Sequence, residues 1–402
     1  MVEADVNILF VNCDFNMFGG IDSGAANRTT LFVKALSQIG HVDVISFYPE
    51  PVVSNINDCD VVFTGNVENT LNLSSNRAIR ILRKWTNLIF TPYNIYNYYK
   101  VNPKRENIVD SLYNLKKYDF VACRYVNDLV GCGLLKYANK LIIDVDDNPV
   151  SALKRDMTNI QYRSYLHKLE KQIELKSLGT VVNKILSKVK LSFYSNIMES
   201  PSSNSIYLHN TTTIKNKIPD IDESTPMRML VVGWLDYFPN KNGAVHFVEN
   251  IFPLIKNAIP NVELHIVGKC NDHNLILRFN QIKGVKALGY VENVIEEYKN
   301  SRVVVVPVYQ GAGTSVKFVE GLMMNRPMVS TPMGVRGFES LCKDGVHYMC
   351  GETDRDFANK SIELLNSIEK SRQISHNAFL VGDLNFSQDS FFKIIKESIN
   401  NL

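Results

Sequence analysis

Short apolar runs alternate with amphipathic stretches along the first half of the chain. Six runs predict buried strands: residues 6–11, 42–47, 60–64, 88–91, 120–123 and 141–145. A helical stretch from Ala25 to Ile39 follows the first run, and a long charged helix is predicted over 151–177. Strands alternating with helices favour a doubly wound parallel sheet, an α/β fold in which ligands bind beyond the carboxyl ends of the strands.

The same pattern begins again after a polar connection at about 208–226. Apolar runs lie within 229–232, 262–269, 285–291 and 303–308, and each is followed by a turn. With 402 residues, two domains are the natural expectation. The order of elements predicts a second sheet of the same kind, and the last segment, FFKIIKESINNL, is predicted to be helical.

The stretch from Val303 to Gly334 carries the clearest local signals. Its first six residues form a β-branched run that is typical of a strand buried on both faces. A Gly-Ala-Gly loop follows, and Thr314 or Ser315 can cap the next helix. Asn325 suits a left-handed closing residue, and Pro327 prevents the helix from continuing. The pattern therefore predicts a strand, a glycine-rich loop, a helix and a strand in succession.

A glycine-rich loop at a helix N-terminus is suited to binding phosphate. Lys317 and Glu320 lie three residues apart on one side of the predicted helix, so both side chains can reach what the loop holds. Lysine suits a phosphate charge, and a carboxylate can accept hydrogen bonds from two sugar hydroxyls. The alternative is an exposed Lys–Glu ion pair over an ordinary turn.

Composition excludes several classes of protein. The net charge is +3, which is too small to indicate nucleic acid. The seven cysteines have no spacing that suits zinc or a disulfide framework, so we expect a reducing, cytoplasmic location. The N-terminus does not resemble a signal peptide, and no apolar run approaches the ~20 residues that span a bilayer.

Basic and aromatic residues gather between positions 77 and 105. The segment RAIRILRKW predicts a basic amphipathic helix that ends at Trp85, and YNIYNYY adds four tyrosines. Cations with aromatic rings suit the surface of a membrane, so the segment predicts peripheral contact with the inner face of a membrane. A plain solvated helix is an equally weighted alternative.

Three aspartates lie at the end of the predicted strand 141–145. Asp144 is within the strand, and Asp146 and Asp147 come directly after it. One interpretation pairs a carboxylate with a nearby arginine while another caps the next helix. A second interpretation gives them a role in acceptor binding, and a third makes them metal ligands, which needs several carboxylates converging on one ion. Because alternate strand residues share a face, Asp144 and Asp146 are expected to point the same way.

The second half resembles the nucleotide-sugar domain of family 4 glycosyltransferases, which have the GT-B fold. The resemblance rests on GAGTSVKFVEGLMMNRPMVSTPMG, on LGYVENVIEEYKNSRVVVVPV before it and on the loop VVGWLDYFPNKNG, and it covers about 225–365. It is closest to the branch with a Gly-x-Gly-Thr loop and a lysine three residues before the glutamate. The first domain matches more loosely, through the glycines near Gly19 and the DVDD strand end.

The resemblance implies two Rossmann-like domains facing across a cleft. Residues 1–207 would form the acceptor-side domain, 208–382 the nucleotide-sugar domain, and 383–402 a C-terminal helix that packs back on the first. The family pattern also has a loop that leads through Pro-Asn to a helix, which we expect to open at Gly243.

Donor-binding residues follow from the motifs. Glu320 matches the second glutamate of the family's Glu-x7-Glu signature, which holds the ribose hydroxyls. The first glutamate is replaced by Ala312, and Trp234 stands where the family often has an arginine. The donor residues implied are Gly19, Gly20, Gly233, Tyr290, Gly311, Gly313, Thr314, Ser315 and Glu320.

The implied reaction transfers a glycosyl unit from a nucleotide-diphosphate sugar to an acceptor hydroxyl, with retention and without a metal or cofactor. Lys241 and Lys317 would stabilise the leaving phosphate, and no base is assigned. The acceptor, a glycan or lipid-linked glycan, is expected at Asp22, Arg28, Arg124, Asp144 and Asp146. The rival interpretations are a non-catalytic binding protein, a nucleotide-sugar 2-epimerase and, least favoured, a phosphorylase.

Overall fold

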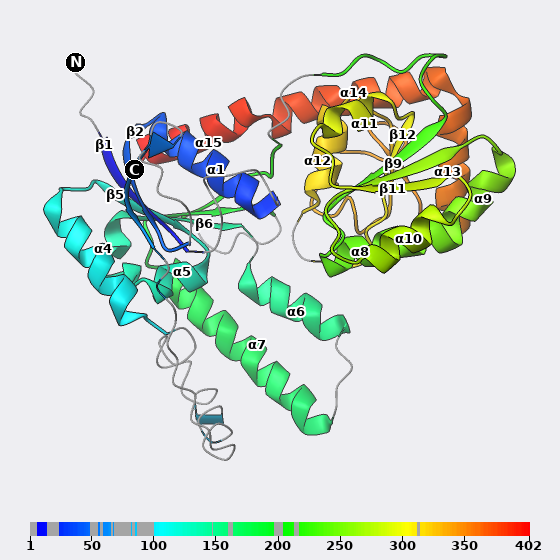
Figure 1. The fold of residues 1–402 in the computed structure, drawn as a ribbon. Helices are drawn as coiled ribbons and strands as arrows, with labels where there is room; N and C mark the ends of the chain where they lie inside the picture. Colours follow the sequence, from blue (N-terminus) through cyan, green and yellow to red (C-terminus); the bar gives the residue numbers. More distant parts are fainter. Residues whose placement is uncertain are drawn as a thin grey trace. The chain divides into compact units, whose positions relative to one another are not determined.

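The computed structural model describes residues 6–13, 24–48, 55–56, 59–65, 67, 82, 85–86, 100–146, 148–159, 164–196, 204–212, 217–311 and 314–402. The chain divides into two compact units (Figure 1). Unit 1 comprises Met1–Leu208 with Phe392–Leu402, and unit 2 comprises His209–Phe391. None of the helices in the described ranges is long and apolar enough to cross a membrane.

Unit 1 is built on an eight-stranded sheet with the order β3-β4-β2-β1-β5-β6-β7-β8. Every neighbouring pair is parallel except β3 with β4. The strands are β1 (Val6–Asn12), β2 (Gly40–Ser46), β3 (Asn55–Ile56), β4 (Cys59–Thr64), β5 (Phe120–Arg124), β6 (Leu141–Asp146), β7 (Leu191–Tyr194) and β8 (Ser205–Tyr207). The predicted parallel sheet is confirmed, whereas the predicted strand at 88–91 lies outside the described residues.

Helices cover both faces of this sheet because its central strands are apolar on both sides. On one face, Phe32 of α1 packs its ring against Phe10 of β1 and Phe193 of β7. The other face carries the core that includes α4, α5 and α7 (Figure 1). The helices of unit 1 are α1 (Gly24–Ser37), α4 (Pro103–Leu115), α5 (Val126–Gly131), η1 (Leu134–Lys140), α6 (Pro149–Asn159) and α7 (Tyr165–Leu186).

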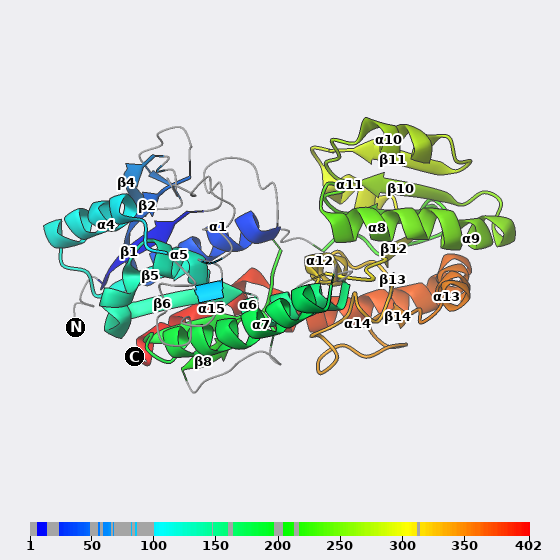
Figure 2. The ribbon, with the colours of Figure 1, turned by 90° about the horizontal axis from the view of Figure 1, so that it is seen from below.

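The single long helix predicted over 151–177 is wrong. Two helices occupy this region, α6 and α7, which are seen apart in Figure 1 and overlap in the view of Figure 2. Ser164 starts the second one, because its hydroxyl accepts the backbone N–H of His167 at 3.2 Å and so caps α7. The continuous polar pattern concealed this cap, and the second helix continues to Leu186.

Unit 2 contains a six-stranded, wholly parallel sheet with the order β11-β10-β9-β12-β13-β14. Its strands are β9 (Arg228–Val232), β10 (Glu263–Val267), β11 (Val285–Gly289), β12 (Val303–Val306), β13 (Met328–Ser330) and β14 (Met349–Cys350). The four apolar runs predicted as strands are confirmed. The second sheet therefore repeats the architecture of the first, as the sequence predicted.

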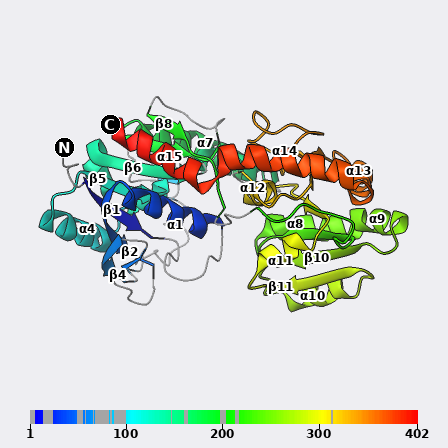
Figure 3. The same ribbon diagram turned by 90° about the horizontal axis from the view of Figure 1, so that it is seen from above.

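The helices of unit 2 also form two layers, seen from above in Figure 3. The core on one face includes residues of α8, η3, α9, α10 and α13, and the core on the other includes residues of α11, α12 and α14. The elements are α8 (Phe238–His246), η3 (Phe247–Ile251), α9 (Phe252–Ala258), α10 (His273–Asn280), α11 (Val294–Lys299), α12 (Val316–Met323), α13 (Asp354–Asn366) and α14 (Ile368–Phe386). A last helix, α15 (Gln388–Asn400), begins in unit 2 and continues into unit 1 from Phe392.

The expectation that Gly243 opens a helix is wrong. Helix α8 begins at Phe238, with Pro239 in its first turn, and Gly243 lies inside it. A β-carbon on Gly243 would overlap the carbonyl oxygen of Pro307. The glycine therefore permits close approach between α8 and the segment after β12, rather than marking a helix start.

The end of α12 is closed as predicted. Asn325 has a left-handed backbone with φ of 53°. Its buried neighbour Arg326 donates to the carbonyl oxygens of Tyr298 at 2.9 Å and Lys299 at 3.0 Å, and to that of Pro219 at 2.7 Å. These bonds tie the end of α11 and the segment before β9 to the end of α12, which fixes that helix on the sheet.

Candidate functional site

The glycine loop of unit 2 leads from β12 into α12. Gly311 has a φ of 139°, a conformation that favours glycine. Ser315 is the N-cap of α12, and its hydroxyl accepts the N–H of Phe318 at 3.4 Å. Thr314 is buried and accepts a hydrogen bond from the amide of Asn210 at 2.7 Å. Ala312 and the predicted donor residue Gly313 lie outside the described residues.

Lys317 projects from the first turn of α12 and is partly buried. Its ammonium group donates to the side-chain oxygen of Asn240, and the amide of Asn240 donates to the carbonyl oxygen of Trp234 at 2.8 Å. Gly233 lies beside this chain of bonds, because a β-carbon there would overlap Cε of Lys317. The predicted residues Gly233 and Lys317 are therefore brought together at the carboxyl end of β9.

Glu320 is also partly buried, one turn further along α12. The hydroxyl of Tyr298 donates to its Oε2 at 3.4 Å. Burial lowers the pKa of Lys317 to about 8, which the charge of Glu320 opposes. Burial raises the pKa of Glu320, which Lys317 and Tyr298 oppose. The ammonium group of Lys317 and the carboxylate of Glu320 are thus both partly buried. A cation can bind a phosphate, and a carboxylate can bind hydroxyl groups of the same ligand.

The structure adds residues that the sequence did not single out. Asn240 orients Lys317, and Tyr298 contacts Glu320. A β-carbon on Gly311 would lie 3.5 Å from Pro239 and 3.9 Å from the hydroxyl of Tyr237, so the glycine loop lies against the start of α8. The sequence feature that indicates Asn240 is an amide just after the loop that follows β9. Ligands of a parallel sheet bind beyond the carboxyl ends of its strands, where this loop lies.

Lys241 does not join this cluster. Its ammonium group pairs with the carboxylate of Asp272 at 2.6 Å, and both side chains are more than a third exposed. The hydrogen bond that Lys241 donates to Asp272 raises the pKa of Lys241. Tyr290, another predicted donor residue, follows Gly289 at the end of β11 and is 72% exposed. Of the two lysines predicted to stabilise the leaving phosphate, Lys317 is therefore the one that lies in the helix following the glycine loop.

Four of the predicted acceptor residues form one buried network in unit 1. Arg28 of α1 donates to both carboxylate oxygens of Asp144, each at 2.8 Å. Arg124 donates to Asp144 at 2.7 Å and to Asp146 at 2.8 Å. Arg124 also donates to the hydroxyl of Thr29 at 2.6 Å. The network ties α1 to the carboxyl ends of β5 and β6.

The network limits what these residues can contact. Asp144 has no exposed surface, and both arginines are at least 96% buried. Burial favours the neutral acid, but Arg28 and Arg124 outweigh it and lower the pKa of Asp144. Asp146 keeps 18% of its side chain exposed and has a left-handed backbone with φ of 59°. The interpretation that pairs carboxylates with arginine describes the observed contacts of both aspartates. Asp22, Gly19 and Gly20, with Asp147, lie outside the described residues.

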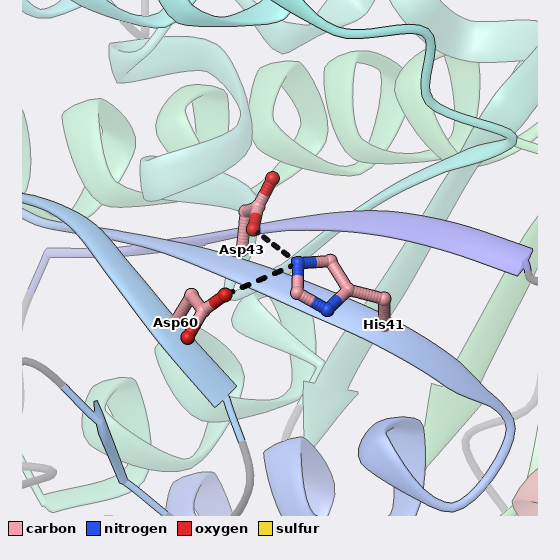
Figure 4. A group of neighbouring side chains, drawn as sticks. All are labelled: His41, Asp43 and Asp60. Carbon is pink, nitrogen blue, oxygen red and sulfur yellow. Dashed lines mark hydrogen bonds and ion pairs between the residues drawn. The ribbon is translucent and has the colours of Figure 1, made fainter.

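One group of described residues has the geometry to hold a cation: His41, Asp43 and Asp60 (Figure 4). It lies at the amino ends of β2 and β4, whereas Asp144 and Asp146 lie at the carboxyl end of β6. Asp43 already accepts hydrogen bonds from Lys116 at 3.0 Å and Tyr118 at 2.6 Å. Burial favours the neutral acid, but the bonds from Tyr118, Lys116 and His41 lower the pKa of Asp43. The group therefore has its own cation and needs no metal to balance its charge.

Comparisons with known proteins agree with this geometry. The sequence family described as Glycosyl transferases group 1 matches residues 226–367, which is most of unit 2. No curated protein matches the chain in sequence.

Solved structures match almost the whole chain. HepE from Anabaena, in complex with UDP and glucose, has a TM-score of 0.64 at 13% identity and covers 98% of this chain and 99% of its own. Sucrose-phosphate synthase from Thermosynechococcus elongatus has a TM-score of 0.65 at 14% identity and covers 98% of both chains. WaaG, a glycosyltransferase involved in lipopolysaccharide biosynthesis, has a TM-score of 0.61 at 13% identity and covers 97% of this chain and 98% of its own. At such identities the likeness establishes the fold, and the fold is GT-B.

Proposed function

We propose that this protein is a glycosyltransferase of the family 4 type that uses a nucleotide-diphosphate sugar as donor. It transfers the glycosyl unit, a hexose, to a hydroxyl of a glycan or lipid-linked glycan, with retention at the anomeric carbon and without a metal. In this proposal the reaction belongs to the assembly of a surface polysaccharide or glycoconjugate.

The observation that carries the proposal is the position of Lys317 and Glu320 beside the glycine loop, close enough for each charge to act on the pKa of the other. Lys317 lies in the first turn of α12 and Glu320 one turn further on, and the capped N-terminus of that helix adds a partial positive charge. The family match over 226–367 includes this loop, and the structure of HepE with UDP-glucose has a similar fold. The fold alone does not specify a substrate, so the proposal rests on the residues at the site.

The leaving nucleoside diphosphate gains negative charge as the glycosidic bond breaks. Lys317 is oriented by Asn240 and stabilises that charge together with the α12 N-terminus. Glu320 holds the ribose by accepting hydrogen bonds from its hydroxyls. In this proposal Lys241, paired with Asp272, contributes at longer range.

The acceptor is proposed to approach from unit 1, near the exposed part of Asp146. In this proposal the acceptor contacts Asp146 directly. The effect of Arg28, Arg124 and Asp144 on the acceptor is indirect, because their contacts hold Asp146 at the carboxyl end of β6. The basic segment 77–105 is proposed to hold the protein on the inner face of a membrane, where a lipid-linked acceptor lies. Most of that segment is outside the described residues.

A second candidate is a binding protein of the same fold that catalyses no reaction. Two departures favour it: Ala312 replaces the first glutamate of the family signature, and Trp234 replaces the arginine. Trp234 is 43% exposed and donates to Asp236 at 3.2 Å, so it supplies no charge to a phosphate.

The deciding experiment measures thermal stability of the purified protein with UDP, GDP, ADP, TDP and CMP. We expect one nucleoside diphosphate to raise the unfolding temperature, because a ligand that binds the native state stabilises it. The Glu320→Ala variant should lose this shift. Hydrolysis of the matching nucleotide sugar, or its transfer to an acceptor, then separates the enzyme from the binding protein. No shift with any nucleotide would contradict the glycosyltransferase and favour the protein that catalyses no reaction.

A further inference from the structure

The first half of α7 presents large apolar side chains to solvent. Tyr165 is 79% exposed, Leu166 is 65% exposed and Leu169 is 37% exposed. These three residues, the α7 tip, fall within five positions at the N-terminal end of the helix. Single exposed leucines are ordinary on protein surfaces, but three large apolar groups together form a patch.

The α7 tip contributes nothing to the core of unit 1. Leu178, Val182 and Ile185 are buried, and they hold the second half of α7 against the sheet. Residues 165–176 are all partly or fully exposed. Figure 1 shows this half of the helix extending away from the strands of unit 1, with α6 beside it. A helix anchored at one end thus carries an apolar tip at the other.

The surroundings of the tip are cationic. Residues 149–176, which contain α6 and the first half of α7, include six lysines or arginines and three acidic residues, an excess of three positive charges. Lys154, Lys168 and Lys176 are exposed. Lys176 follows Leu169 by seven positions and therefore shares its face of the helix. The N-terminus of α7, capped by Ser164, adds the positive end of the helix dipole.

We propose that the α7 tip docks on an anionic lipid bilayer, with the tip in the acyl boundary and the lysines at the headgroup phosphates. Apolar side chains flanked by cations are what an interfacial helix needs. A protein partner fits less well, because three side chains cover far less area than a specific protein interface. This surface is separate from segment 77–105, and the inference does not depend on any glycosyl transfer.

The test measures binding to vesicles by sedimentation, using phosphatidylcholine alone and phosphatidylcholine with one quarter phosphatidylglycerol. We expect the full-length protein to bind only the anionic vesicles at about 0.05 M salt and to be released at about 0.5 M, where charges are screened. The variant Tyr165→Ser with Leu166→Ser and Leu169→Ser should bind roughly tenfold more weakly, because the apolar insertion is lost.

A matched control carries serine at three leucines that are 54% to 81% exposed elsewhere: Leu115, Leu380 and Leu384. It should bind within about twofold of the wild type, since only the tip inserts. All these side chains are exposed, so thermal unfolding should be unchanged in both variants. Lys154→Glu with Lys176→Glu should weaken binding at low salt and leave little effect at high salt.

Four outcomes would overturn the inference. The first is a wild type that ignores anionic vesicles at low salt. The second is an equal loss in the tip variant and the control, and the third is loss of binding only in Arg80→Glu with Arg83→Glu, which would move the contact to segment 77–105. The fourth is a tip variant that converts a dimer to a monomer and still binds vesicles, which would make the tip a contact between copies of this chain.

Discussion

The side chain of Lys317 extends past the α-carbon of Gly233 to reach Asn240. A β-carbon on Gly233 would overlap Cε of Lys317 and would lie 3.1 Å from both its Nζ and the amide nitrogen of Asn240. Because Gly233 has no side chain, the ammonium group of Lys317 can lie close to the backbone at the end of β9. A glycine here serves the approach of a side chain, not a turn.

Adding that β-carbon is expected to impair the site without unfolding unit 2. In Gly233→Ala the flexible end of Lys317 must move, which breaks its bond to Asn240. We expect the dissociation constant for the nucleoside diphosphate to rise roughly tenfold, the loss of one charge-assisted hydrogen bond. Calorimetric titration measures it. Gly131→Ala is the control, because nothing lies within 4 Å of its added β-carbon. Equal affinity in Gly233→Ala and wild type would separate Lys317 from the ligand.

Nucleotide binding should weaken in alkaline solution. Burial lowers the pKa of Lys317 to about 8, so the charged form that attracts phosphate is present below that pH and is lost above it. Affinity measured from pH 7 to 10 is expected to be level at first and to fall as pH rises through about 8. Lys317→Met should bind weakly at every pH, with no such decline.

Lys241→Met provides the matched comparison, because it removes a lysine of the same unit that is paired with Asp272 and largely solvated. An exposed ion pair contributes little, because solvent screens it. We expect Lys241→Met to keep the alkaline decline and to lose only a small part of the affinity. A decline that vanishes in Lys241→Met and persists in Lys317→Met would reverse the roles assigned to the two lysines.

Glu320 should distinguish ribose from deoxyribose. If its carboxylate accepts hydrogen bonds from both ribose hydroxyls, a 2′-deoxynucleoside diphosphate should bind roughly tenfold more weakly than the ribonucleotide, which corresponds to one hydrogen bond to a charged group. The Glu320→Ala variant should bind the two alike. Pyrophosphate alone serves as the control, and its affinity should change little in this variant. A preference that survives in Glu320→Ala would place the ribose elsewhere.

Asp144 should be important for the stability of unit 1. Its two arginine partners are buried, so Asp144→Asn leaves buried positive charge without compensation and should destabilise by about 3 kcal/mol. The lowered pKa of Asp144 gives stability that is present above the ordinary carboxyl value of about 4 and is lost as pH falls below it. The difference between wild type and Asp144→Asn in urea unfolding should therefore shrink in acid.

The comparison for Asp144→Asn is Glu397→Gln in α15. That carboxylate pairs with Lys393 at 3.9 Å, and both side chains are more than 60% exposed. Its removal should cost about 0–1 kcal/mol, since solvent already screens the pair. Similar losses in the two variants would mean that the buried network adds nothing beyond a surface ion pair.

The sequence by itself determined the features that depend on neighbours along the chain. The β-branched run from Val303 predicted β12, and Asn325 predicted the left-handed end of α12. A hydroxyl at Thr314 or Ser315 predicted the start of α12, and the structure has Ser315 as its cap. Each is set by steric preference or by a hydrogen bond over a few residues, which is why the pattern is sufficient. The repeat of strand and helix predicted both sheets for the same reason.

The sequence failed where a local pattern admitted two outcomes. Nothing in the charged stretch 151–177 distinguishes one helix from two, and the cap at Ser164 decided it. Gly243 could open a helix or permit close packing, and only its contact with Pro307, far along the chain, shows which.

Only the tertiary structure decided which charges meet. Asn240 and Lys317 are 77 positions apart, and Arg28 and Asp144 are 116 positions apart. Lys241, beside Asn240 in sequence, pairs with Asp272. Electrostatic and hydrogen-bond energies depend on distance and burial in the folded molecule, and residue type sets neither. The sequence therefore determined which elements form the site, and packing determined which side chains occupy it.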